Sequence, residues 1–91
     1  MPDVLVWTTP DVYSRSGMDG DVSSPADLGR AVRHARTSLG LSQEVVAAAA
    51  GVGVRFVVEL EAGKPTVQLE KVLVVLAALG MRLALVDAGG G

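Results

Sequence analysis

Glycine positions divide most of this 91-residue chain into short segments. Apolar residues recur at three- and four-residue spacings in four stretches, and a glycine follows each stretch, at positions 40, 51, 63 and 80. A glycine at that place ends a helix because it adopts left-handed backbone conformations without strain. The pattern predicts four short helices: residues 26–39, residues 42–50, residue 53 to the glycine at 63, and residue 66 to the glycine at 80.

Residues at the predicted helix starts support these boundaries. Ser42 is expected to cap the second helix and Thr66 the fourth, because side-chain hydroxyls accept hydrogen bonds from the free N–H groups of a first turn. The fourth helix is apolar on nearly all faces, so we expect its own domain and a second subunit to cover it. Its main stripe consists of Leu69, Val72, Leu73, Leu76 and Leu79.

Composition excludes several classes of protein. The chain has no cysteine and a single histidine, His34, which leaves no disulfide, no thiolate or Ser-His nucleophile and no metal cluster of cysteines or histidines. We therefore expect no enzyme, no cofactor, and no catalytic or metal-binding residues. The sequence has neither an apolar stretch long enough for a membrane span nor the basic start of a signal peptide, which predicts a cytoplasmic protein.

Charge is distributed unevenly along the chain, whose net charge is −2. Residues 1–27 carry five acidic side chains and one basic one, whereas residues 28–91 carry seven basic and five acidic ones. The first region is also rich in proline, glycine and serine and shows no helical period. Met18 within this region is a candidate for the start of translation. The predicted parts are an acidic, mostly irregular arm (1–25), a helical DNA-binding domain (26–80), a strand (81–87) and a disordered tail (88–91).

The second and third predicted helices, joined by a tight turn at Gly51, form a helix-turn-helix. In that motif the first helix spans the DNA backbone and the second enters the major groove. The surrounding residues resemble the lambda-repressor-like (Cro/CI, XRE) family. Seven residues fall on positions of the family's pattern at fixed spacing, namely Ser42, Gln43, Ala47, Gly51, Val52, Glu61 and Gly63.

The resemblance narrows to HipB-type antitoxins and covers about residues 26–87. The similar stretches are 55–57, 59–61, 63–66, 76–80 and 81–86. Members of that family form homodimers through a C-terminal strand, bind palindromes in their own promoter and hold a HipA-type serine/threonine kinase toxin. The resemblance therefore implies an all-α, lambda-repressor-like domain that serves as antitoxin and autorepressor of a type II toxin–antitoxin operon. Its implied partners are a palindromic double-stranded operator, a HipA-like kinase toxin and a second copy of the chain, with no membrane.

Two alternatives stay open. A phage or plasmid repressor without a toxin has the same features, and gene order separates it from an antitoxin. A protein-sequestering module that has lost DNA affinity is favoured by the net negative charge. It is also favoured by Glu59 and by Val54, Val58 and Ala62, because related proteins often have polar or basic residues at the last three positions.

The expected DNA contacts lie on the helix-turn-helix and directly after it. Arg55 is placed to bond a guanine or a phosphate, Val54 and Val58 to contact thymine methyl groups, and Glu59 to repel DNA unless it accepts from a cytosine amino group. The alternative for each is an ordinary surface residue, which is also the expectation for Arg30, Arg33 and Arg36. The candidate DNA-binding set, with phosphate contacts from its first and last members, is Gln43, Gly53, Val54, Arg55, Val58, Glu59 and Lys64.

Residues 81–86 alternate in the manner of a strand, with Met81, Leu83 and Leu85 on one side. A single strand after four helices has no partner in its own domain. Because unpaired strand edges are costly and adhesive, we predict antiparallel pairing with the same strand of a second copy about a two-fold axis. The candidate dimerisation set is Met81, Leu83, Leu85 and Val75.

Overall fold

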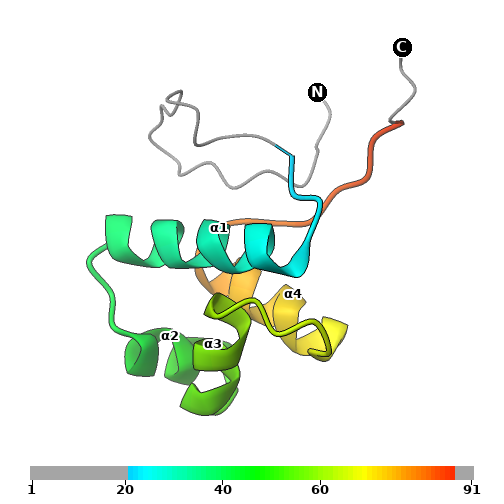
Figure 1. Cartoon of the computed structure of the whole chain (residues 1–91). Coiled ribbons are helices and arrows are strands. Elements are labelled where there is room, and N and C mark those ends of the chain that lie inside the picture. The colour runs from blue at the N-terminus through cyan, green and yellow to red at the C-terminus, as the bar shows by residue number, and fades with distance from the viewer. Residues whose placement is uncertain (1–20, 88–91) are drawn as a thin grey trace.

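The computed structural model describes residues 21–87, which form four helices. α1 spans Pro25–Ser38, α2 spans Gln43–Ala50, α3 spans Val54–Glu61 and α4 spans Leu69–Ala78. Figure 1 shows α1 lying along one side of the domain, with the other three helices packed beneath it. This arrangement confirms the predicted all-α, four-helix fold. The described part of the predicted arm begins at residue 21, and the predicted tail 88–91 lies outside the described residues.

Local sequence explains where the first two helices begin. Ser24 precedes α1 in an extended conformation, and its hydroxyl accepts a 3.0 Å hydrogen bond from the backbone N–H of Asp27. Ser42 caps α2 as predicted, and its hydroxyl accepts a 3.1 Å bond from the N–H of Val45. The end of α2 is set by Gly51, whose φ of 75° lies in the left-handed region.

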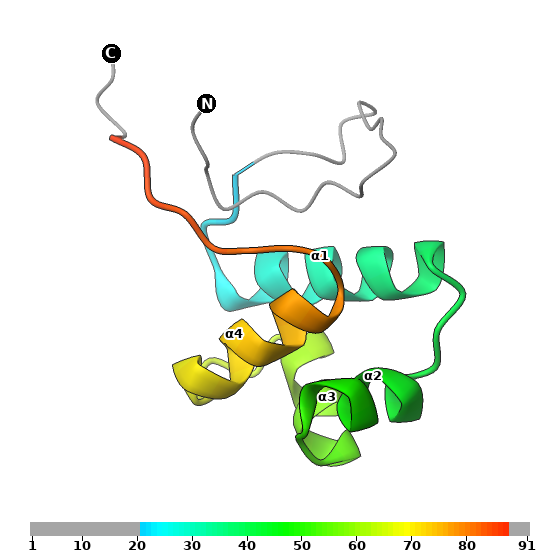
Figure 2. The ribbon, with the colours of Figure 1, turned by 180° about the vertical axis from the view of Figure 1, so that it is seen from behind.

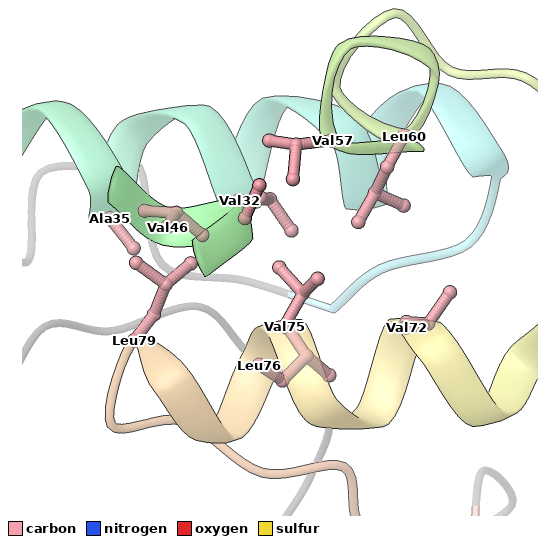
Figure 3. Close-up of a cluster of buried hydrophobic side chains, with 10 residues drawn as sticks. Val32, Ala35, Val46, Val57, Leu60, Val72, Val75, Leu76 and Leu79 are labelled. Carbon is pink, nitrogen blue, oxygen red and sulfur yellow. The ribbon is translucent and has the colours of Figure 1, made fainter. Parts of the chain in front are cut away.

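The core is built from small aliphatic side chains on all four helices. In Figure 3 Val72 and Val75 of α4, and Leu79 directly after this helix, point toward residues of the other three helices. Aliphatic burial of this kind is the main stabilising term for a small domain. The buried cluster comprises Val32, Ala35, Val46, Ala47, Val57, Leu60, Val72, Val75, Leu76 and Leu79.

α1 approaches α3 closely at Gly29. A Cβ atom at this position would lie 2.6 Å from the carbonyl oxygens of both Leu60 and Glu61. These oxygens belong to the backbone and have no rotamer through which to move away. Glycine is therefore required here for the spacing of the two helices rather than for a special backbone angle.

The predicted start of the fourth helix is wrong. α4 begins at Leu69 after Gln68, and Thr66 does not cap it. The reason is tertiary: Val67 packs against the hydrophobic core, so residues 65–68 cross from α3 to α4 without helical structure. The buried stripe also differs from the prediction, because Leu69 and Leu73 are 61% and 41% exposed.

Val75 was predicted to contact a second subunit, and the structure corrects this assignment. Its side chain is fully buried in the core of its own chain, which leaves it no surface to offer a partner. Within the described residues, 81–87 form no regular secondary structure in the single chain. Figure 2 shows this segment leaving α4 and crossing α1. Met81 and Leu83 pack against the core, whereas Leu85 is 92% exposed, and pairing with a second copy stays a prediction.

Candidate nucleic-acid interface

α2 and α3 are joined by a hydrogen-bonded turn and share the hydrophobic core. The backbone N–H of Val52 donates a 3.0 Å hydrogen bond to the carbonyl of Ala47, which closes the turn behind α2. Gly53 then precedes α3 in an extended conformation. The buried side chains Val46 and Val57 lie in the common core and fix the two helices against the rest of the domain.

One face of α3 is turned away from that core. Val54 and Val58 are 39% and 44% exposed, and the Arg55 side chain is 78% exposed. The opposite face holds Val57 and Leu60, which are buried. The outward face of this eight-residue helix therefore presents two valine side chains and one arginine, whose planar guanidinium can donate two parallel hydrogen bonds.

Charged side chains continue this outward face from α3 into the loop after it. Glu59 lies between two cations, with one carboxylate oxygen 3.8 Å from Nε of Arg55 and the other 3.3 Å from Nζ of Lys64. We call these three residues the exposed charge triad. Lys71 of α4 adds a further cation beside it, with Nζ 5.8 Å from the centre of the Phe56 ring, and Phe56 and Lys71 line the same shallow hollow as the triad.

A second set of charged residues lies on the inner side of the helix-turn-helix. Arg36 of α1 binds Glu61 of α3 through two parallel hydrogen bonds of 2.6 and 2.9 Å, and its remaining nitrogen donates 2.9 Å to the carbonyl of Leu41. Gln43 of α2 donates a 3.1 Å bond to the same carboxylate. We call Arg36, Gln43 and Glu61 the buried polar triad, because the arginine and glutamate side chains are only 12% and 6% exposed.

The buried polar triad ties three helices together at one carboxylate. Its hydrogen bonds with Glu61 raise the pKa of Arg36 above the usual value, which favours the charged guanidinium in this half-enclosed place. The expectation that Arg36 is an ordinary solvated residue is therefore wrong. One feature of the sequence pointed to the contact between Gln43 and Glu61, because both residues fall on positions of the lambda-repressor-like pattern.

The other predicted site residues divide into two groups. Gly53, Val54, Arg55, Val58 and Glu59 lie together at the start and along the outward face of α3, with Lys64 bound to Glu59. Gln43 is half-buried and directed at Glu61, so one of its two amide hydrogens is already bonded. Among residues 21–87 no group of three or more His, Cys, Asp or Glu side chains is arranged to hold a metal ion, and no helix is long and apolar enough to cross a membrane.

Comparison with known proteins identifies relatives of this chain. The sequence profile of the family described as "Helix-turn-helix domain" matches residues 27–89. The chain is 48% identical over 68 residues to the "uncharacterized HTH-type transcriptional regulator y4mF" of Sinorhizobium fredii, a match that covers 75% of this chain and 90% of that protein.

Solved structures show the same fold. The chain superimposes on the protein of the "HipB-O4 20mer complex" with a TM-score of 0.71 at 23% identity, covering 76% of this chain and 97% of that one. The "HipA-HipB-O2-O3 complex" gives a TM-score of 0.70 at 22% identity, covering 75% and 96%. The restriction-modification controller protein C.AhdI from Aeromonas hydrophila gives 0.59 at 33% identity, covering 64% and 84%. With its exposed α3 face, its profile match over most of the chain and its y4mF-like sequence, the chain belongs to the helix-turn-helix family of DNA-binding transcriptional regulators.

Proposed function

We propose that this protein is a homodimeric autorepressor and antitoxin that binds a palindromic operator in its own promoter and neutralises a HipA-like serine/threonine kinase toxin. The outward face of α3 carries this proposal, because it presents Val54, Arg55 and Val58 to solvent on a helix whose orientation is held by the buried polar triad. The likeness to solved HipB complexes supports the antitoxin part, and the exposed helix face supports the DNA-binding part.

Each predicted DNA contact has a role on this surface. Arg55 reads a guanine through its fork, while Val54 and Val58 contact thymine methyl groups. Gly53 has no side chain and nothing within 4 Å of its Cβ position, so its backbone can approach DNA closely. Gln43, through its second amide hydrogen, and Lys64 contact phosphates and set the register of α3 in the groove.

The dimer is proposed to form around α4 and the segment after it. Leu69, Leu73 and Val74 expose apolar surface on α4, and Leu85 stands almost fully in solvent beyond the anchored Met81 and Leu83. Pairing of residues 81–87 with the same segment of a second copy would cover the exposed Leu85.

DNA binding is tested by fluorescence anisotropy of the purified protein on a labelled duplex from its own upstream region. The comparisons are a scrambled duplex and an Arg55→Ala variant, each at low and moderate salt. We expect tight binding that prefers the upstream duplex, with each phosphate contact contributing about −0.9 to the log-log salt slope. Absence of any preference in a folded, dimeric protein would reject sequence-specific repression.

The antitoxin role needs a separate test. We expect a kinase-like reading frame beside this one, and co-purification of its product with this protein when both are expressed. Sequence-preferring DNA binding without such a neighbour would instead support a repressor that has no toxin.

A protein-sequestering module is the second candidate function. The observation that favours it is Glu59, which places a negative charge on the same face as the exposed Val54 and Val58. Such a module would show no salt-dependent DNA binding.

A further inference from the structure

The exposed charge triad is the least expected feature of the proposed DNA-binding face. Glu59 has a side chain that is 36% exposed and contacts both Arg55 and Lys64, the two cations that the proposed function assigns to DNA. A carboxylate at this place opposes binding to any polyanion. It also partly neutralises two of the residues that would otherwise attract phosphates without regard to sequence.

These ion pairs are weak enough to be exchanged for contacts with DNA. Surface pairs contribute little to stability, because water and salt screen them. The Arg55 side chain is 78% exposed and the Lys64 side chain 45% exposed, so both can turn toward DNA with little loss of packing. Once they do, the Glu59 carboxylate is left facing the duplex without its cations.

The cost of that unpaired carboxylate depends on the base beside it. In the major groove the cytosine N4 amino group donates a hydrogen bond that a glutamate can accept, whereas guanine presents only acceptors there. Arg55 and Glu59 are four residues apart on α3, which places them about 6 Å apart along the helix axis. This separation corresponds to about two base-pair steps, so an arginine contact to guanine and a glutamate contact to cytosine fit into one half-site.

We propose that Glu59 is a specificity-determining residue: it pairs with Arg55 and Lys64 on non-cognate DNA, which weakens phosphate binding there, and releases them at the operator, where it accepts a hydrogen bond from a cytosine. The inference rests on the proposed DNA-binding function and adds the chemistry of one operator position. Specificity arises in this scheme by disfavouring wrong sequences as much as by favouring the right one.

The test is the Glu59→Gln variant, which keeps the size of the side chain and removes its charge. Glu70→Gln is the matched control, since Glu70 is an exposed glutamate in the first turn of α4 that ion-pairs with neither cation among the described residues. Anisotropy is measured on the upstream duplex, on a scrambled duplex and on upstream duplexes in which each C·G pair is changed to T·A in turn. Circular dichroism melting confirms that each variant is folded.

We expect Glu59→Gln to bind the scrambled duplex about 3- to 10-fold more tightly than the parent, with a steeper salt slope, and Glu70→Gln to show less than half of that gain. The preference for the upstream duplex should fall in Glu59→Gln alone. One C·G to T·A change should weaken the parent about 5- to 150-fold and weaken Glu59→Gln less, because the amide oxygen accepts only a neutral hydrogen bond from cytosine and the amide N–H can donate to the thymine O4 instead.

Two results would overturn the inference while leaving the proposed function in place. One is an unchanged affinity of Glu59→Gln for the scrambled duplex, and the other is an equal gain on both duplexes with no cytosine position that separates the variants. A parent protein that showed no preference for the upstream duplex would instead reject the proposed function itself.

Discussion

α3 carries two glutamates only two residues apart, and each binds an arginine in a different environment. Glu61 is 6% exposed and holds Arg36 at 2.6 Å, whereas Glu59 is 36% exposed and lies 3.8 Å from Arg55. Residues two apart on a helix project about 200° from one another, so the two carboxylates face opposite sides of α3. One pair faces the interior of the domain and the other faces the proposed DNA surface.

The comparison teaches that burial, and not the type of charge, decides what an ion pair does. In the buried polar triad every hydrogen bond replaces lost solvation, so loss of one partner leaves an uncompensated charge. In the exposed charge triad water takes the place of either partner, so the pair contributes little to stability and remains available for exchange. The first triad joins α1, α2 and α3, and the second is exposed on the surface that we propose binds DNA.

Removal of Glu61 should have the largest effect on stability. We expect Glu61→Ala to lower the free energy of unfolding by about 3 kcal/mol, because it strands the Arg36 guanidinium in a site that is 12% exposed. Glu59→Ala is the matched control on the same helix and should change stability by about 1 kcal/mol or less. Urea denaturation measures both, and equal losses would contradict the distinction between the two triads.

The approach of α1 to α3 can be disturbed without touching any charge. An alanine normally stabilises a helix relative to glycine, but Gly29→Ala should destabilise this domain by about 1–3 kcal/mol, since its Cβ would overlap the carbonyls of Leu60 and Glu61. Gly53→Ser, at an extended N-cap position with nothing within 4 Å, should cause no loss. Thermal melting would contradict this account if Gly29→Ala melted at or above the temperature of the parent.

The Arg55→Ala variant tests whether the exposed charge triad acts in DNA binding rather than in stability. We expect a loss of about 1–3 kcal/mol in binding free energy on the upstream duplex, together with a change of about 0.5 kcal/mol or less in the free energy of unfolding. Arg33→Ala, which removes an exposed arginine from α1, should leave the sequence preference unchanged. Anisotropy and urea denaturation on the same preparations separate the two effects, and a large loss of stability in Arg55→Ala would place this arginine with the structural set.

The smallest expected effect is a pH dependence of stability at the start of α1. It comes from Asp27, which is a third carboxylate with hydrogen-bond partners, beside Glu59 and Glu61. The backbone N–H of Ser23 donates to its carboxylate and, with help from the Ser23 hydroxyl and Arg30, holds the pKa of Asp27 below its ordinary value of 3.8. Its contribution to stability is therefore present above pH 3.8 and is lost as the pH falls through the lower pKa of the folded protein. Asp27→Asn should be slightly less stable than the parent at neutral pH, and acid titrations followed by circular dichroism should show the difference vanish at low pH. A constant difference across that range would contradict the assignment.

Much of the fold was predictable because its signals are local. The glycine after α2 and the cap at Ser42 act within a few residues of the chain, and both were found as predicted. The predictions failed at Thr66, which does not cap a helix, and at Leu73, which is not buried. Both outcomes depend on how the other helices pack against this part of the chain. Thr66 has a hydroxyl that could cap a helix, but Val67 packs against the core and α4 begins only at Leu69. Leu73 is strongly apolar but is 41% exposed, whereas Val75 on the same helix is fully buried in the core.

The candidate site was predictable to a similar degree. The position of Arg55 in the first turn of α3 follows from the helix boundaries alone. The partner of Arg36 does not, because Glu61 lies 25 residues away and only the packing of α1 against α3 brings the two together. The role of Glu59 between Arg55 and Lys64 likewise required the path of the chain after α3.

The sequence by itself determined the four helices, the turn between α2 and α3 and the family to which the chain belongs, since periodicity, capping and glycine placement act over a few residues. Only the tertiary structure decided which arginine is buried, which valine lies inside and which carboxylate faces outward. The physical reason is that desolvation depends on neighbours distant in the chain, and it is desolvation that makes the Arg36–Glu61 pair structural and leaves the Arg55–Glu59 pair exchangeable.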